Sequence, residues 1–176
     1  MMRKASWLSY LVLAMVLTAS VSCGYALEGR GSFLPDHILH IGIPTFRNLT
    51  TQPGLAEVIT SEIYSQFVTR GDFDLSGATS GVDAVLLGDI TAYNYIPRAI
   101  DEEGMATSYM IQITANISFR DLVEDRVLWE QRGYVFQSEY QLSRDESDFV
   151  TQESYAVRLA AEDFASSVVG TILTGF

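Results

Sequence analysis

The stretch from Tyr109 to Arg120 shows the clearest alternation in the chain, and it limits the possible folds more than any other segment. Residues with an apolar or aromatic side chain stand at every second position: Tyr109, Ile111, Ile113, Ala115, Ile117 and Phe119. Between them stand Met110, Gln112, Thr114, Asn116, Ser118 and Arg120. Successive side chains of a strand point to opposite faces. The segment is therefore predicted to be a strand with one buried face.

Two more long segments flank this strand and have the composition of strands. Val82 to Ile100 is rich in β-forming residues and ends in the turn sequence DEEG, and Val127 to Leu142 follows the turn sequence DLVEDR. Consecutive strands joined by tight turns pair as antiparallel neighbours. Arms of about 15 residues span about 50 Å at ~3.3 Å per residue, so the sequence predicts a tall sheet.

The remaining segments predict one further strand and two helices. His37 to Phe46 reads as a first strand, with Pro44 near its end on an edge of the sheet. A helix is predicted after Pro53 and Gly54, and a second one after a capping pattern at residues 143–146. The apolar stripe of the first helix is Leu55, Val58, Ile59, Ile63 and Phe67, and that of the second is Val157, Ala160, Ala161, Phe164, Val168 and Ile172.

The order strand, helix, three strands, helix predicts an α+β fold. We expect a two-layer sandwich in which two helices pack on one face of a four-stranded mixed sheet. The predicted organisation is a signal peptide over residues 1–22, an anchor and tether over residues 23–34, and a single α+β domain over residues 35–176. The glycine-rich and charged sequence YALEGRGS is typical of such a tether.

The amino-terminal segment predicts export. A basic start with Arg3 and Lys4 precedes an apolar run of about 12 to 15 residues, which is typical of a secretory signal and too short for a spanning helix. Cys23 is the only cysteine, so it forms no internal disulfide. The sequence SVSCG resembles a bacterial lipobox, with Ser20 where leucine is usual. We expect lipidation of Cys23, and several acyl chains anchor stably. The alternative is ordinary cleavage near Ser22, which leaves a free thiol.

Charge and motifs argue against nucleic-acid binding and against catalysis. The chain has 11 basic and 22 acidic residues and a formal charge of −11, which disfavours binding to a phosphate backbone. His37 and His40 are predicted to point to opposite faces of a strand, and the DEEG sequence lacks the alternating oxygen ligands of a calcium loop. No nucleophile motif or phosphate loop is present. We therefore expect no enzyme activity, no cofactor and no metal site.

The chain resembles the family of lipopolysaccharide-assembly lipoproteins (LptE). The resemblance runs in collinear order through CGYALEGRGSFLP, IGIPTFRNLTTQPGLAEVITSEIYSQFVTRG, DAVLLGDITAYNY, SYMIQITANISFRD, VLWEQ and AAEDFASSVVGTILTGF. It implies a lipoprotein anchored at the periplasmic face of the outer membrane. It also implies a one-to-one complex, in which the lipoprotein plugs and helps to assemble the large β-barrel that inserts lipopolysaccharide into the outer leaflet, and contact with lipopolysaccharide itself.

The residues suggest how such a plug would meet its partners. Large outer-membrane barrels have a polar interior, so the neutral polar face formed by Gln112, Thr114, Asn116 and Ser118 is a candidate for contact with the barrel. Any sheet face exposed to water would have the same composition.

The predicted meander places the DEEG turn and the connection after Leu142 at the same end of the sheet. Arg98 and Arg144 would then lie together beside Tyr93 and Tyr95, and two guanidinium groups next to aromatic rings suit the phosphates of lipopolysaccharide. The alternative is a hairpin tip in which nearby carboxylates neutralise both arginines.

A second function of another class remains compatible with the sequence. Small α+β sandwiches serve many roles, and a free-standing periplasmic lipoprotein that binds a soluble ligand or regulates a cell-wall enzyme would need the same signal and fold.

Overall fold

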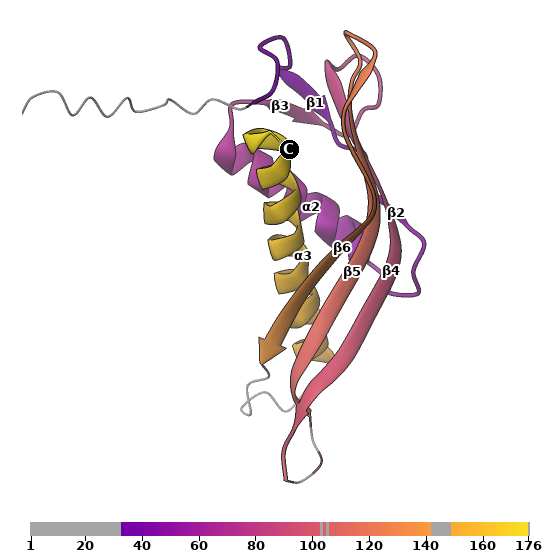
Figure 1. The fold of residues 1–176 in the computed structure, drawn as a ribbon, viewed down its shortest axis with the longest axis vertical. Helices are drawn as coiled ribbons and strands as arrows, with labels where there is room; N and C mark the ends of the chain where they lie inside the picture. The colour runs from indigo at the N-terminus through magenta and orange to yellow at the C-terminus, as the bar shows by residue number, and fades with distance from the viewer. Residues whose placement is uncertain (1–32, 103, 105, 142–148, 176) are drawn as a thin grey trace, which may run out of the picture. The chain divides into compact units, whose positions relative to one another are not determined.

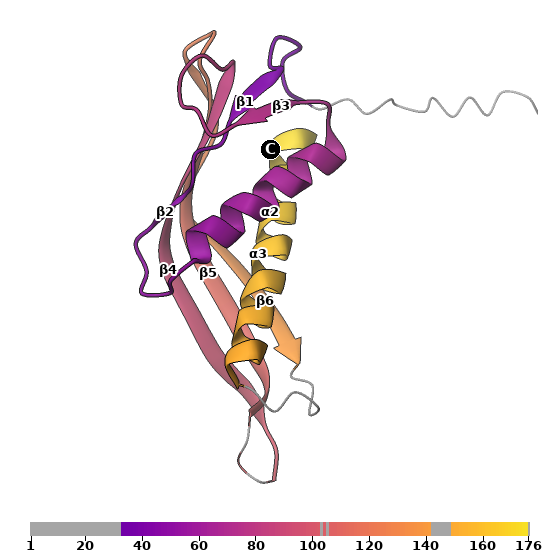
Figure 2. The same ribbon diagram turned by 180° about the vertical axis from the view of Figure 1, so that it is seen from behind.

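The computed structural model describes residues 33–102, 104, 106–141 and 149–175, and for residues 149–153 only the course of the helix. In this part of the chain six strands form one mixed sheet, and helices α2 (Leu55–Arg70) and α3 (Phe149–Thr174) lie on one of its faces (Figures 1 and 2). The prediction of an α+β fold with two helices and a mixed sheet is confirmed. The prediction of four strands is wrong, because the sheet has six.

The strands run in the order β3-β1-β4-β5-β6, with β2 beside β4. Their bounds are β1 (His40–Gly42), β2 (Arg47–Asn48), β3 (Asp74–Ser76), β4 (Ala84–Ile100), β5 (Ala106–Asp121) and β6 (Arg126–Gln141). Strand β1 pairs in parallel with β3 and β4, and β2 pairs in parallel with β4. The three long strands form the predicted antiparallel meander.

The short strands account for the error in the strand number. The predicted strand over residues 37–46 is reduced to β1, which has neighbours on both sides and is therefore not an edge strand. Pro44 lies in the connection from β1 to β2. Strands of two or three residues are too short to show alternation, and their parallel pairing depends on segments distant in the sequence.

A one-residue bulge in β4 changes which side chains face the helices. Ile90 pairs with Ala115 and Ala92 with Thr114, so Thr91 is an extra residue in β4. Before the bulge the even-numbered residues of β4 share the face of buried Ile90, and after it the odd-numbered residues do. Tyr93 and Tyr95 therefore lie on the helix-facing side and pack against the core.

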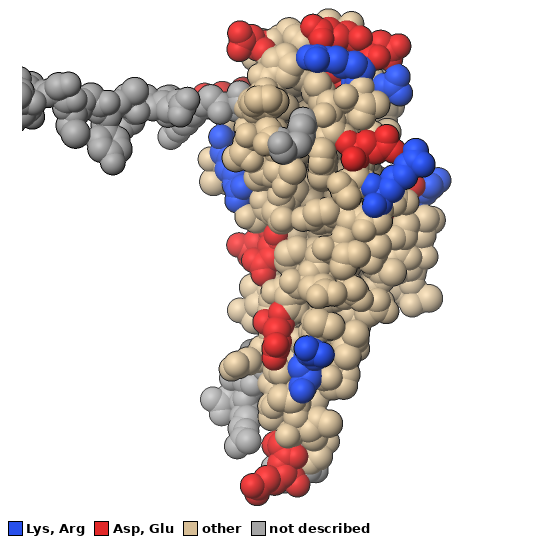
Figure 3. Space-filling model, in the orientation of Figure 1, with Lys and Arg blue, Asp and Glu red and all other residues tan. Residues whose placement is uncertain are grey.

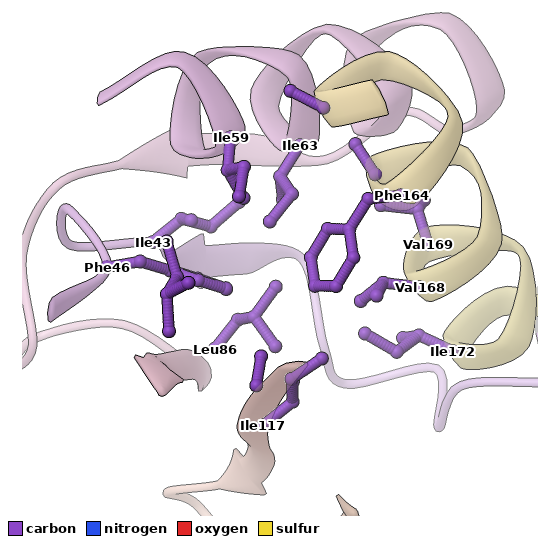
Figure 4. Close-up of a cluster of buried hydrophobic side chains, with 14 of the residues drawn as sticks. Ile43, Phe46, Ile59, Ile63, Leu86, Ile117, Phe164, Val168, Val169 and Ile172 are labelled. Atoms are coloured by element: carbon purple, nitrogen blue, oxygen red, sulfur yellow. The ribbon is translucent and has the colours of Figure 1, made fainter. Parts of the chain in front are cut away.

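The core lies between the two helices and the inner face of the meander. Side chains from both helices and the sheet point toward one another there (Figure 4). They come from α2 (Ile59, Ile63), α3 (Phe164, Val168, Val169, Ile172) and the sheet (Leu86, Ile117). The predicted helical stripes are confirmed, since their residues are buried, apart from the partly buried Val58. Among the described residues, neither helix combines the length and the apolar character that crossing a membrane requires.

Helix α3 also fixes the outermost strand β6. The rings of Tyr134 and Phe136 contact Phe164 edge-on, with centroids 5.7 Å and 6.0 Å apart. The Tyr140 hydroxyl donates to Asp163 Oδ2 over 3.1 Å. Burial, with a further contribution from the nearby Asp163 carboxylate, raises the pKa of Tyr140 to about 12.

Candidate interaction surface

The face of the meander opposite the helices is the candidate interaction surface. Both helices pack on the other side, so no described helix covers it (Figures 1 and 2). Gln112, Thr114, Asn116 and Ser118 all lie on this face, because they alternate with the buried residues of β5. We call it the outer face.

One row of polar side chains crosses the outer face, and the neighbouring rows combine polar side chains with exposed apolar ones such as Leu87 and Val135. Gln112 lies between Asn94 of β4 and Gln137 of β6, and the Asn94 side-chain amide donates to Gln112 Oε1 over 3.1 Å. Near the β4–β5 turn, the Ser108 hydroxyl donates to Glu139 Oε1 over 2.8 Å. Cross-strand pairs of this kind hold side chains in fixed positions. The outer face therefore presents an ordered set of hydrogen-bonding groups.

A bulge in β6 interrupts this pattern at Gly133. Ala115 pairs with Tyr134 and Ile117 with Gln131, so β6 contains one extra residue. Gly133 has a φ of 63°, a conformation that other residues adopt at a cost. Asn116 Oδ1 accepts a hydrogen bond from the Gly133 N–H over 2.8 Å. Asn116 therefore holds the bulge, in addition to lying on the predicted contact face.

An open groove of about 610 Å³ lies beside this bulge. Its lining comes from the β1–β2 connection, β2 and the three long strands: Pro44, Thr45, Arg47, Leu87, Gly88, Asp89, Asn116, Ile117, Ser118, Glu130 and Arg132. The Phe46 N–H donates to the buried Thr60 hydroxyl, and a Cβ atom at Gly88 would lie 2.1 Å from the Phe46 ring. These contacts fix the β1–β2 connection against β4, so packing of Phe46 in the core holds this wall of the groove in place.

Two arginine–carboxylate pairs line the groove. Arg47 donates from Nε and Nη2 to both oxygens of Asp89, over 3.0 Å and 2.8 Å. Arg132 donates from Nε to Glu130 Oε1 over 2.7 Å. Glu130 raises the pKa of the Arg132 guanidinium. The described lining thus carries two arginines and two carboxylates and has no net formal charge, whereas the whole chain carries −11.

The structure describes three of the four predicted lipopolysaccharide-contact residues: Arg98, Tyr93 and Tyr95. Arg98 is exposed and is the extra residue of a second bulge in β4, near the β4–β5 turn. Tyr93 and Tyr95 lie on the helix-facing side, and Tyr95 stacks on Tyr109 with centroids 4.1 Å apart. Arg144 lies outside the described residues, so its predicted proximity to Arg98 stays a prediction. Cys23, with its predicted lipidation, also lies outside them.

A group of hydrogen-bonded acids at the opposite end of the meander was not identified from the sequence. Asp121 is fully buried and accepts hydrogen bonds at Oδ1 from the Val123 and Glu124 N–H groups, and its Oδ2 lies 2.8 Å from His37 Nε2. Burial alone would raise the pKa of Asp121, but these hydrogen bonds outweigh it and leave the pKa below its ordinary value. Acidic and basic side chains gather at this end of the visible face (Figure 3).

The same end contains a second histidine–aspartate contact. Asp83 Oδ2 accepts from the Leu39 and His40 N–H groups and lies 3.1 Å from His40 Nδ1. The two backbone hydrogen bonds lower the pKa of Asp83. His37 and His40 thus contact different aspartates: the first contact ties the segment before β1 to β5, and the second ties the start of β1 to the residue before β4.

His37, Asp121 and Glu124 are near enough to hold a metal ion, and Arg126 pairs with both carboxylates of this group. Their ligand atoms lie within 4.8 Å of one another. Arg126 Nε lies 2.8 Å from Glu124 Oε2 and 3.7 Å from Asp121 Oδ2. A guanidinium group supplies the positive charge that a cation would bring. The arrangement is an ion-pair network that closes the β5–β6 turn.

Comparison with known proteins assigns the chain to a family. Two helices on one face of a mixed sheet, with the other face of a long meander uncovered, define a one-sided α+β sandwich. The chain belongs to the lipopolysaccharide-assembly family, LptE, whose model matches residues 39–172. No curated protein sequence matches the chain significantly.

Solved structures share the fold at low sequence identity. The chain resembles the PelC dodecamer from Paraburkholderia phytofirmans with a TM-score of 0.51 and 15% identity, covering 82% of this chain and 91% of that one. Protein XCC0632 from Xanthomonas campestris has a TM-score of 0.52 and 12% identity, covering 77% and 84%. The hypothetical protein CT253 from Chlamydia trachomatis has a TM-score of 0.52 and 7% identity, covering 76% and 95%. At these identities the likeness concerns the fold alone.

Proposed function

We propose that this chain is an outer-membrane lipoprotein that plugs, and helps to assemble, the β-barrel that inserts lipopolysaccharide into the outer leaflet. Membership of the lipopolysaccharide-assembly family supports a role in lipopolysaccharide assembly. The observation that carries the plug role is the one-sided sandwich. Helices α2 and α3 cover one face of the meander, and the outer face presents the polar row of Asn94, Gln112 and Gln137 together with Thr114, Asn116 and Ser118. Such a face suits the polar interior of a large barrel.

The proposal places Gln112, Thr114, Asn116 and Ser118 against the barrel wall. Asn116 is less available for such contact than the other three, because its side-chain carbonyl oxygen already accepts a hydrogen bond from the Gly133 N–H. The other three keep hydrogen-bonding groups directed away from the core. Interfaces of this polarity are held by hydrogen bonds and bridging water as well as by apolar contact.

Co-purification from outer membranes tests the plug role. A tagged full-length chain, expressed with its native envelope, is expected to copurify with a single large outer-membrane barrel in a one-to-one complex, identified by mass spectrometry and by its mass in detergent. Recovery of the chain as a monomer with no barrel bound to it would contradict the proposal. That result would favour the free-standing periplasmic lipoprotein, which binds a soluble ligand or regulates a cell-wall enzyme without a membrane partner.

We further propose that Arg98, with Arg144, contacts lipopolysaccharide phosphates. Arg98 is exposed at a bulge near the β4–β5 turn, and no described residue forms an ion pair with it. Reversing both charges is expected to weaken lipopolysaccharide binding more than Arg158→Glu on the exposed side of α3 does. Equal losses in a binding assay would show a general effect of charge and no site.

A further inference from the structure

We propose that the groove beside the β6 bulge is the docking site for a loop of the barrel partner, and that Arg132 binds an acidic side chain of that loop. The inference rests on the proposed function, since it takes the barrel as the partner. It adds a defined site, an anchor residue and the chemistry of the group that the anchor recognises.

The guanidinium group of Arg132 is held on one side only. Its Nε is taken by Glu130 over 2.7 Å, and no described residue accepts a hydrogen bond from its Nη1 or Nη2. Its side chain is 84% exposed. A guanidinium group held at Nε presents its two terminal nitrogens as a planar pair of donors, which matches the two oxygens of a carboxylate. Glu130 thus orients Arg132 for a bidentate contact with a second acid.

The bulge in β6 places Arg132 and Gly133 together opposite Asn116. The extra residue in β6 breaks the alternation between Gln131 and Tyr134, and Arg132 lies in the break. The Asn116 side chain closes the bulge through the Gly133 N–H. Bulges re-aim side chains near binding sites. Asn116 therefore fixes the backbone directly after Arg132.

The lining of the groove indicates a protein loop as the occupant. Asp89 and Glu130 balance Arg47 and Arg132, so the groove has no net positive charge with which to attract a multiply charged phosphate. Within the lining of the groove, Leu87 is 43% exposed and offers apolar contact, and Ser118 and Thr45 offer hydrogen bonds. Arginine beside apolar surface is common at the centre of protein interfaces. One carboxylate on an otherwise neutral loop fits this combination.

Charge reversal and crosslinking test the proposal on the full-length lipoprotein in outer membranes. Arg132→Glu is expected to reduce recovery of the barrel at least about tenfold, since a charge pair at an interface then becomes a repulsion. Arg132→Lys, which keeps the charge and loses the planar donors, is expected to give an intermediate loss. Arg158→Glu on α3 is the matched control and should leave recovery unchanged. Circular dichroism and thermal unfolding establish that each variant is folded.

A photo-crosslinking residue at Ser118, with Arg132 intact, provides a measurement that is independent of the variants' folding. The expected adduct is with a barrel peptide that contains Asp or Glu, and reversing that acid should restore recovery of Arg132→Glu. An adduct with a second copy of this chain, or with a peptide that lacks an acid, would overturn the proposal.

The remaining outcomes separate this inference from the proposed function. Absence of a barrel complex with the unmodified chain would refute the plug role itself. A normal complex with the unmodified chain, and equal recovery with Arg132→Glu and Arg158→Glu, would refute only the groove. If Arg132→Glu weakened binding of purified lipopolysaccharide while recovery of the barrel stayed unchanged, the groove would be a phosphate site, and the proposal of a protein loop would be wrong.

Discussion

At the residue scale, Asp121 shows how one buried carboxylate organises the end of the sheet. It joins the β5–β6 turn, through the Val123 and Glu124 N–H groups, to His37 in the segment before β1. The sequence gives no sign of this role, because DLVEDR contains several acids and only the fold buries one of them. The contact with His37 spans 84 residues.

Replacing Asp121 is expected to be costly and to change the response to acid. Asp121→Ala removes the acceptor of three partly buried hydrogen bonds and leaves a small cavity, so it should lower the free energy of unfolding by about 2–4 kcal/mol. The folded pKa of Asp121 lies below its unfolded value of about 3.9. Its stabilisation is therefore complete above about pH 4 and is lost as the pH falls through the folded pKa. Urea unfolding between pH 7 and pH 2.5 measures both effects.

Asp125→Asn is the control for this prediction, because Asp125 lies in the same turn, its side chain is 82% exposed, and asparagine tolerates its φ of 50°. Its unfolding free energy should change by less than about 1 kcal/mol. If the Asp121 variant kept the parent's loss of stability in acid, the assigned role of Asp121 would be wrong. Asp83, whose pKa is also lowered, would then account for the loss of stability in acid.

At the scale of elements, sequence periodicity predicted the long segments well. The strand over Tyr109 to Arg120 and the apolar stripes of both helices were confirmed, because each is long enough for its period to be evident. The short strands β2 and β3 were missed. The candidate surface was predicted in part: alternation identified Gln112, Thr114, Asn116 and Ser118, but bulges cannot be seen in a sequence pattern, so neither the groove nor the inward position of Tyr93 was foreseen.

Phe164 is expected to determine how firmly α3 holds β6. It is fully buried and touches the rings of Tyr134 and Phe136 on the edge strand. Phe164→Ala should lower the free energy of unfolding by about 3–5 kcal/mol through the lost contacts and the cavity left behind. Arg158→Ala on the exposed side of α3 should cost less than about 1 kcal/mol. Chemical unfolding gives the values, and hydrogen exchange should show β6 amides opening more often than those of β5.

Equal exchange in β5 and β6 of the Phe164 variant would mean that the sheet holds β6 without help from the helix. In that case the sandwich would unfold as one unit, and the aromatic contacts would add stability without local control of the edge strand.

At the scale of the whole molecule, the proposed function joins a membrane anchor to a folded plug. The proposed anchor depends on Cys23, which stands directly after the predicted signal. In this proposal, lipidation and insertion into a barrel are separate attachments. Either alone could keep the protein at the membrane, so they must be tested apart.

Cys23→Ala is expected to release the chain from membranes that lack the barrel. Loss of the acyl chains removes the apolar contribution of about 0.8 kcal/mol for each buried methylene group. With the barrel present, the same variant should remain partly in the membrane fraction through the plug contact. Cell fractionation with and without the barrel separates the two attachments. Unchanged fractionation without the barrel would refute lipidation at Cys23.

The extra residue at Thr91 has a consequence for how this protein can change over generations. Removing that residue would leave Ile90 opposite Ala115 and Ala92 opposite Thr114, so Tyr93 and Tyr95 would still face the helices and Asn94 the outer face. A descendant could therefore lose a residue here without turning over the rest of β4. Loss of a residue from a regularly paired part of the strand would instead carry every following side chain to the opposite face.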